Sequence, residues 1–327
     1  MARFILFRVL SMIPALLAIS VLTFIVIQLP PGDFVSTLAA QAAETGNTME
    51  QATLDTLRER YGIGDSVVEQ YFRWIGGIVQ GDFGYSFEWN QPVSQLVWER
   101  MAMTSLVAVL TLLFVWSVAL PVGVYSAVNK YSIGDYVATL FGFIGMATPN
   151  FLLAIVLMYF ATIHMGQSVG GLFSPEYVDA PWSFARLWDF LSHVWIPVIV
   201  LGTAGTAALI RVMRANLLDE LGKPYVEAAR ARGVPERKLI AKYPVRVAIN
   251  PFISTVGWVL PTLISGELIV STVLNLPTAG PLLLQALKSQ DMYLAGAFLL
   301  MTGALVLIGT LLSDILLAVI DPRIQFA

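Results

Sequence analysis

Long runs without a charged residue dominate the pattern of hydrophobic and polar positions. A helix needs about 20 apolar residues to cross a bilayer, and lipid offers the backbone no hydrogen-bond partners, so runs this long are helical. The chain has six long apolar runs, within residues 9–32, 101–129, 137–163, 194–210, 247–274 and 292–320; the first four carry no charge, and the last two carry one acid each, Glu267 and Asp314. The pattern predicts an all-α membrane protein with six transmembrane helices.

Composition agrees with a membrane protein and excludes several other classes. Of the 327 residues, 57% are hydrophobic and 13% are charged, whereas a soluble domain is about 25% charged. A net charge of -3 offers no electrostatic attraction to a nucleic-acid backbone. The absence of Cys excludes disulfides and thiolate metal sites, and two His, His164 and His193, leave little for metal chemistry.

Basic residues set the direction of the spans, because Lys and Arg collect in cytoplasmic loops. With the N-terminus inside, the inner segments total 59 residues and hold 13 of the 19 basic residues, and the outer segments total 120 residues and hold six. We therefore expect both termini in the cytoplasm. Residues 1–43 could instead be a cleaved signal peptide, but their apolar run exceeds the roughly 7–15 residues of a signal h-region, and no A-x-A site follows it closely.

The inner segment 211–247 carries nine basic residues and is long for a connector. Pro224 predicts the first turn of a short helix and Gly233 its C-terminal cap. The small side chains of Ala228, Ala229 and Ala231 would let another surface approach such a rigid knob closely. The alternative is a solvated basic loop beside anionic lipid headgroups.

This segment resembles a known family. Glu227-Ala228-Ala229, followed after three residues by Gly233, resembles the EAA motif in permease subunits of type I ABC importers. Three further motifs resemble its dipeptide, oligopeptide and nickel branch: Pro31-Gly32-Asp33, Gly81-Asp82-Phe83-Gly84 with Ser86, and Asp321-Pro322-Arg323. The resemblance covers essentially all of residues 1–327, as one permease domain with six spans.

The resemblance implies that residues 211–247 form a cytoplasmic coupling loop that docks on an ATPase subunit. The coupling residues it implies are Tyr225, Glu227, Ala228, Ala229, Arg232 and Gly233. It also implies a second homologous permease subunit, two ATPase subunits that bind ATP and Mg, and an extracytoplasmic solute-binding protein in a bacterial inner membrane. The expected cargo is a peptide or a similarly sized solute such as an oligosaccharide, moved by alternating access.

The outer loop, residues 30–100, is too long and too acidic for a simple turn. It contains a helical pattern at 53–61 and amphipathic aromatics at Tyr71, Phe72 and Trp74. We expect a folded extracytoplasmic cap. Two roles stay open for it, contact with the binding protein and stability alone.

The chain departs from the family near the outer end of the fifth span. Glu267 stands where a small neutral residue is usual, and Ser271 where an acid is usual. A charge in lipid costs roughly 2.5–3.5 kcal/mol at the centre of a span, so Glu267 and Asp314 are expected to face inward or lie near an interface. Glu267, with Ser271, is the candidate for the translocation path or for a structural hydrogen bond. For Asp314 a structural partner, such as a basic residue of the inner loop, is expected.

No phosphate-binding G-x-x-x-x-G-K-[ST] loop and no catalytic motif occurs, so the chain is expected to be a non-catalytic path without a cofactor of its own. An ion-coupled secondary transporter that uses Glu267 and Asp314 is the main alternative, and a membrane-embedded enzyme or scaffold is another. Four prolines that fall inside spans are candidate hinges: Pro121, Pro149, Pro197 and Pro261.

Overall fold

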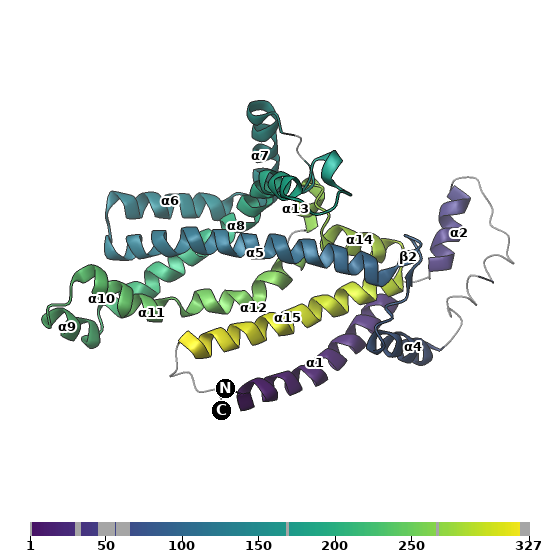
Figure 1. Ribbon diagram of the computed structural model, residues 1–327, viewed down its shortest axis with the longest axis horizontal. Coiled ribbons are helices and arrows are strands. Elements are labelled where there is room, and N and C mark those ends of the chain that lie inside the picture. The colour runs from purple at the N-terminus through teal and green to yellow at the C-terminus, as the bar shows by residue number, and fades with distance from the viewer. Residues whose placement is uncertain are drawn as a thin grey trace. The chain divides into compact units, whose positions relative to one another are not determined.

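The computed structural model describes residues 2–29, 34–44, 56, 66–167, 170–265 and 268–320 (Figure 1). The chain divides into two compact units. Unit 1 comprises Met1–Met103 and Thr278–Leu305, and unit 2 comprises Thr104–Pro277 and Val306–Ala327. Four sequence features lie outside the described residues: Pro31-Gly32-Asp33, the expected helix at 53–61 apart from residue 56, Glu267, and Asp321-Pro322-Arg323.

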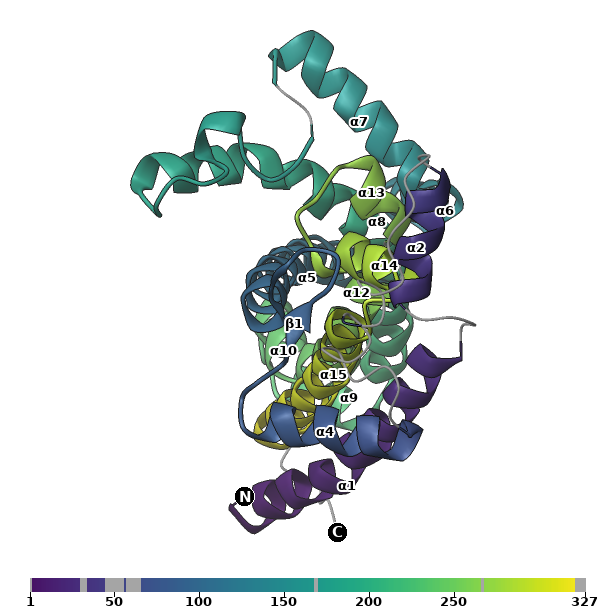
Figure 2. The same ribbon diagram turned by 90° about the vertical axis from the view of Figure 1, so that its right-hand side faces the viewer.

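Unit 1 is built from helices and one small hairpin. Its elements are α1 (Ala2–Gln28), α2 (Phe34–Glu44), α4 (Val67–Val79), β1 (Tyr85–Ser86), β2 (Gln91–Pro92), the start of α5 (Val93–Val128), α14 (Ala279–Lys288) and the start of α15 (Met292–Ile320). The strands are antiparallel, with Tyr85 opposite Pro92. Buried Phe24, Trp74 and Leu300 join α1, α4 and α15 in one core, and Figure 2 shows α4 lying across α1.

Unit 2 holds most of the membrane-spanning helices. It contains the rest of α5, α6 (Ile133–Ala147), α7 (Asn150–Met165), the 3-10 helix η1 (Pro175–Tyr177), α8 (Phe184–Leu221), α9 (Pro224–Ala231), α10 (Glu236–Lys242), α11 (Pro244–Ala248), α12 (Asn250–Ser265), α13 (Leu268–Val273) and the end of α15. Its core lies where α5, α8 and α12 meet, around Met213, Leu217 and Phe252, each 0% exposed.

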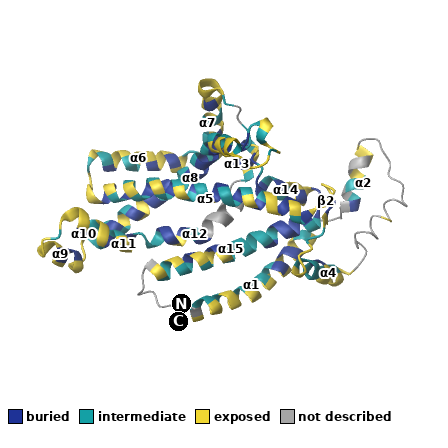
Figure 3. Cartoon of the chain, in the orientation of Figure 1, coloured by how far each residue is buried: buried dark blue, intermediate teal, exposed yellow. Residues whose placement is uncertain are grey.

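The predicted all-α membrane fold is confirmed. Within the described residues, α1, α5, α8 and α15 are each long and apolar enough to cross a membrane, and the α6–α7 pair adds a fifth span if the two helices count as one. Apolar residues on these helices remain exposed to the surroundings, as Figure 3 shows along α1 and α6. The predicted fifth span, 247–274, runs through α12 and α13 and crosses residues 266–267, which lie outside the described set. The count of six therefore stays a prediction.

The third predicted span, 137–163, is not one straight helix. α6 ends at Ala147 and α7 starts at Asn150, bent by 102° from α6, and Figures 1 and 2 show α7 leaving the direction of α6. The cause is Pro149, which disfavours helical geometry in the residue before it. Thr148 accordingly has extended backbone angles, φ -78° and ψ 122°. By contrast, α5 and α8 continue as helices through Pro121 and Pro197.

Candidate functional site

The EAA-like segment forms the helix that the sequence predicts, α9. Its first residue is Pro224. The N–H of a first helical residue has no acceptor within the helix, so proline, which lacks this N–H, loses no hydrogen bond there. Glu227 lies in the first turn and Arg230 in the last, matching the helix dipole. α9, α10 and α11 lie together at one end of unit 2 (Figure 1).

The C-terminus of α9 is closed by a Schellman motif. Gly233 has φ +75°, a left-handed conformation that glycine adopts without strain. The Gly233 N–H donates to the Arg230 carbonyl at 3.0 Å, and the Val234 N–H donates to the Ala229 carbonyl at 3.3 Å. Val234 packs on Val226 and Ala229, the apolar contact that accompanies this motif. The helix therefore ends in a fixed, compact turn.

The two faces of α9 differ in burial. Val226 and Ala229 are buried against Leu239 of α10, so Ala229 packs inward and does not present a small side chain to a partner, contrary to the expectation for it. Tyr225, Ala228 and Arg232 lie at helical spacing and are exposed. Glu227, Ala231 and Gly233 are exposed as well. The exposed face of α9 therefore carries an aromatic, a small and a charged side chain in succession.

Two side-chain contacts fix α9 at its ends. The Arg230 guanidinium binds the Glu236 carboxylate of α10 with two hydrogen bonds, of 2.7 and 3.1 Å. These bonds lower the pKa of Glu236 below its ordinary value. At the other end, the Tyr225 hydroxyl donates to the carboxylate of Glu220, in the last turn of α8. α9 is thereby tied both to the spanning helix before it and to the short helix after it.

An ion pair joins α6 to α8, just before this loop. Arg214 donates from Nε and Nη2 to the Asp135 carboxylate, with both distances 2.8 Å, and Asp135 is 2% exposed. The Tyr131 N–H also donates to Asp135, at 2.9 Å. Both charges belong to the predicted inner segments, but the pair was not predicted, because spacing along the chain does not say which helices are neighbours.

The Gly81-Asp82-Phe83-Gly84 and Ser86 motif has a structural role in unit 1. The Ser86 hydroxyl donates to the Asp291 carboxylate at 2.5 Å, and Asp291 caps α15 by accepting from the Leu294 N–H at 3.2 Å. Burial raises the pKa of the Asp291 carboxyl above its ordinary value, against the opposite effect of these hydrogen bonds. Asp291 was not singled out from the sequence, since a lone acid before a helix carries no sign of a distant partner.

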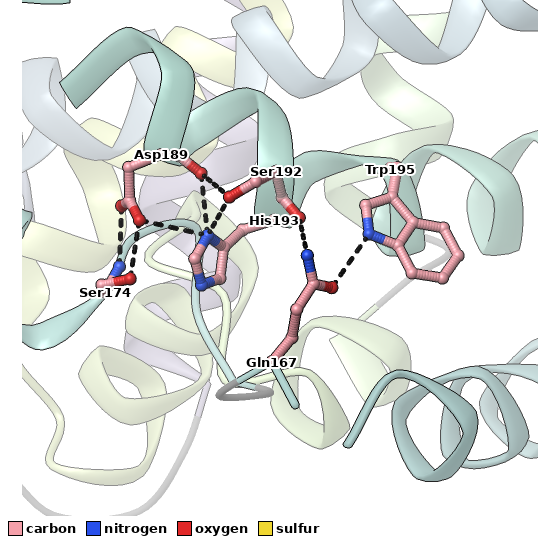
Figure 4. A network of polar contacts seen from close by, with 6 residues as sticks. All are labelled: Gln167, Ser174, Asp189, Ser192, His193 and Trp195. Carbon is pink, nitrogen blue, oxygen red and sulfur yellow. Dashed lines mark hydrogen bonds and ion pairs between the residues drawn. The ribbon is translucent and has the colours of Figure 1, made fainter. Parts of the chain in front are cut away.

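A polar network surrounds the start of α8 in unit 2 (Figure 4). Asp189 accepts from the Ser174 N–H at 2.8 Å and from the Ser174 hydroxyl at 2.6 Å. His193 Nδ1 lies 2.8 Å from the Asp189 carbonyl oxygen. Gln167 donates to the Ser192 carbonyl at 3.1 Å and accepts from the Trp195 indole at 3.3 Å. These bonds attach the segments on both sides of residues 168–169 to α8.

The remaining candidates are placed as follows. Ser271 is buried in α13, at 6% exposure, while Glu267 lies outside the described residues. Asp314 is half-buried in α15, beside Ser313, whose hydroxyl donates to the Ile253 carbonyl of α12 at 3.1 Å. Among the described residues, no group of three or more His, Cys, Asp or Glu could hold a metal ion.

Comparison with known proteins identifies the family to which the chain belongs. The family described as binding-protein-dependent transport system inner membrane component matches residues 119–326, and the N-terminal family of the same membrane component matches residues 1–108. The chain belongs to this family. It is a permease subunit of a type I ABC importer, a non-catalytic multi-pass protein of the inner membrane, and the ion-coupled alternative is not favoured.

The relatives of this permease align over its full length. The oligopeptide transport system permease protein AppB of Bacillus subtilis is 33% identical, and the alignment covers the full length of both chains. The dipeptide transport system permease protein DppB of Escherichia coli K12 is 29% identical over 99% of each chain. The nickel import system permease protein NikB of Staphylococcus aureus is 29% identical over 97% of this chain and 90% of its own.

Among solved structures, an inward-facing form of the MetNI methionine ABC transporter is similar to this permease with a TM-score of 0.48 at 17% identity, over 70% of this chain and 96% of that one.

Proposed function

We propose that this permease forms the translocation path for short peptides by alternating access, driven by separate ATPase subunits. The observation that carries the proposal is the full-length similarity to permeases named for oligopeptides and dipeptides. The relatives named above lend no support to an oligosaccharide cargo, so the proposal is for peptides.

The coupling step is assigned to the outward face of α9. Tyr225, Ala228 and Arg232 are exposed at helical spacing, and Glu227 is exposed as well. Ala229 and Gly233 act differently: Ala229 packs the helix onto α10, and Gly233 closes its end. Because both ends of α9 are fixed, force applied to this face passes to α8 rather than being absorbed by loop motion.

The partners follow from this assignment. ATP and Mg bind to two ATPase subunits, one of which receives α9. A second, homologous permease completes the path, and an extracytoplasmic solute-binding protein delivers the peptide. Residues 211–247 are then the cytoplasmic coupling loop, residues 30–100 the extracytoplasmic cap, and both termini cytoplasmic, in agreement with the placement of 13 of 19 basic residues in the inner segments.

The path itself is assigned to Glu267 and Ser271 at the outer half of the fifth span. The burial of Ser271 in α13 fits a residue that faces other helices rather than lipid. Asp314 is assigned a structural role, because its neighbour Ser313 already joins α15 to α12. A Glu267→Gln variant should change substrate affinity or turnover without loss of assembly, and unchanged kinetics would contradict the path role.

Reconstitution tests the whole proposal. The permease pair, its ATPase subunits and its binding protein in lipid vesicles should take up a labelled dipeptide only when ATP is supplied. Glu227→Lys should leave assembly intact, abolish uptake and leave uncoupled ATP hydrolysis. Glu99→Lys, the same charge reversal at an exposed position of α5, should keep uptake. Uptake without ATP, uptake of nickel but no peptide, or normal uptake by Glu227→Lys would contradict the proposal.

A further inference from the structure

One side of α4 exposes large apolar side chains. Val68, Phe72 and Val79, called here the α4 stripe, are 64%, 66% and 81% exposed. Their spacing of four and seven residues places them on one side of a helix with 3.6 residues per turn. The side chains that join α4 to the core of unit 1 are different ones, chiefly Tyr71 and Trp74. Scattered exposed apolar residues are ordinary, but several gathered on one helix face indicate a surface that a partner covers.

The other side of α4 is polar. Ser66, Glu69, Gln70, Arg73 and Gln80 fall on that side by the same helical spacing. A helix with one apolar and one polar face is the type that lies in the boundary between lipid headgroups and acyl chains. Glu69 and Arg73 are the two charges of α4 and cancel each other, so burial of apolar surface, and not attraction to anionic lipid, would hold this helix on a membrane.

α1 provides a reference for depth, because it is long and apolar enough to cross a membrane. Gln28 is its last residue, and Ser20 lies nearer its middle, about 12 Å deeper at 1.5 Å per residue. Between them, Leu22 and Ile25 are 61% and 51% exposed, as expected for side chains that face lipid on a spanning helix. An element that packs on this stretch of α1 therefore lies near one surface of the bilayer.

Two hydrogen bonds fix how α4 is rolled on α1. The Gln28 amide donates to Oε1 of Gln70 at 2.8 Å, whereas the Tyr71 hydroxyl is hydrogen-bonded to the deeper Ser20 hydroxyl, also at 2.8 Å. Phe24 lies between these two levels and meets the Tyr71 ring at a centroid distance of 5.4 Å. Figure 2 shows α4 lying across α1. The Gln70 side of α4 thus points to the membrane surface, and its Tyr71 side points to the membrane interior.

This roll turns the α4 stripe toward the acyl chains. The stripe is on the Tyr71 side of the helix, and the polar face is on the Gln70 side. The depth agrees as well, because α4 crosses α1 at Phe24, about 6 Å from the end of α1. Interfacial helices bury their apolar face about 5–10 Å into the boundary between headgroups and acyl chains. The lipid-facing surface of α1 therefore continues onto α4.

We propose that α4 is an interfacial membrane helix whose stripe inserts into the acyl-chain boundary of a phospholipid leaflet, the outer leaflet in the proposed topology. Since α4 has no net charge, zwitterionic phospholipid is sufficient. The helix shares its core with α1 and α15, so it holds the ends of both at a fixed depth. The inference goes beyond the transport of peptides and is independent of the cargo.

Single cysteines test the inference, because the natural sequence has none. Val79→Cys and Gln80→Cys change neighbouring exposed positions on the apolar and the polar side. Each variant carries a bimane label in the assembled importer, in phosphatidylcholine nanodiscs without binding protein. Nitroxide-labelled lipids should quench the label at position 79 more than at position 80, and iodide in the buffer should do the reverse. Phe72→Cys should behave as Val79→Cys does.

The depth of the label is a second readout. A nitroxide near the headgroup should quench the label at Val79→Cys more than a nitroxide at the end of the acyl chain. Leu22→Cys, at an exposed position in the span of α1, is the control and should give the opposite order. A profile at Val79→Cys that matches Leu22→Cys would mean that α4 enters the core of the bilayer, which contradicts an interfacial helix.

Three further results would overturn the inference. Quenching of the Val79→Cys label by iodide alone would mean that the stripe faces water. Protection of this label from both quenchers would mean that a protein surface, such as that of the second permease, covers the stripe. Equal quenching of Val79→Cys and Gln80→Cys by nitroxide lipid would mean that α4 has no fixed roll on the membrane.

Discussion

The guanidinium of Arg214 on α8 holds the buried carboxylate of Asp135 on α6 through two hydrogen bonds, each 2.8 Å long. α8 leads directly into α9, and α6 leads into the bend at Pro149. The ion pair therefore joins the helix that precedes α9 to the helix that precedes the bend. If α9 couples to an ATPase subunit as proposed, we expect its displacement to reach α6 through this contact as well as through packing.

Asp135→Asn should destabilise unit 2, because it leaves the positive charge of Arg214 without its carboxylate partner. Removal of one member of a buried pair costs about 3–5 kcal/mol, and Arg214 is 27% exposed, so we expect the lower end, about 3 kcal/mol. Equilibrium unfolding in mixed micelles measures it. The double variant Asp135→Asn with Arg214→Met should recover part of the loss, and a double variant no better than the sum of the singles would contradict the coupling.

Gly84→Ala should cost more stability than Gly81→Ala. Both glycines have left-handed backbones, φ +79° and +83°, so each substitution carries about 1–2 kcal/mol of backbone strain. Only at Gly84 would the new Cβ clash with the Tyr293 ring, at 2.6 Å, whereas at Gly81 nothing lies within 4 Å. We expect a further loss of about 1–3 kcal/mol at Gly84, seen as a lower thermal midpoint. Equal midpoints would contradict the packing argument.

Gly233→Ala should loosen the end of α9 and lower the number of peptides imported per ATP hydrolysed. The strain of an alanine at φ +75° is about 1–2 kcal/mol, enough to populate an open turn. Gly222→Ala is the matched control, because φ is -86° at Gly222 and an added Cβ meets no atom closer than 3.8 Å. Transport and ATPase assays on the reconstituted complex measure the number of peptides imported per ATP hydrolysed. If this ratio is unchanged in Gly233→Ala, the cap plays no part in coupling.

The wild type should gain stability relative to Asp291→Asn as the pH falls from 7 towards 4. Burial raises the pKa of Asp291 in the folded state, so between the ordinary value and this raised value the folded protein binds more protons than the unfolded chain. The free energy of unfolding then rises as the pH falls, and the asparagine does not titrate. Thermal midpoints of both proteins across this range measure the effect, and a difference that moves in favour of the variant would contradict it.

The orientation of the spans can be tested directly, because the natural sequence contains no cysteine. A membrane-impermeant maleimide applied to intact spheroplasts should label Gln80→Cys and not Lys238→Cys, since both positions are exposed and lie on opposite sides in the proposed topology. Inverted vesicles should give the reverse. The same labelling pattern in both preparations would contradict the topology.

The two ends of α9 could be predicted from the sequence. Pro224 and Gly233 act through backbone geometry within a few residues, so its beginning and its Schellman end were predicted correctly. The inward rotation of Ala229 was not predicted, because it depends on where Leu239 of the next helix packs. Likewise Pro149 was a candidate hinge inside a predicted span, but the 102° bend required the position of both helices.

The sequence by itself determined that this protein is a helical membrane permease with a capped knob in its most basic loop. Hydrophobic run length and helix caps are local quantities, and they suffice for the helical spans and the capped knob, while the permease family came from the resemblance of the sequence motifs. Only the tertiary structure decided which distant groups meet: Asp135 with Arg214, and Ser86 with Asp291. Each contact depends on which elements far apart in the chain pack side by side. Many packing arrangements of apolar spans would bury them equally well in lipid, so hydrophobicity alone does not choose among these arrangements.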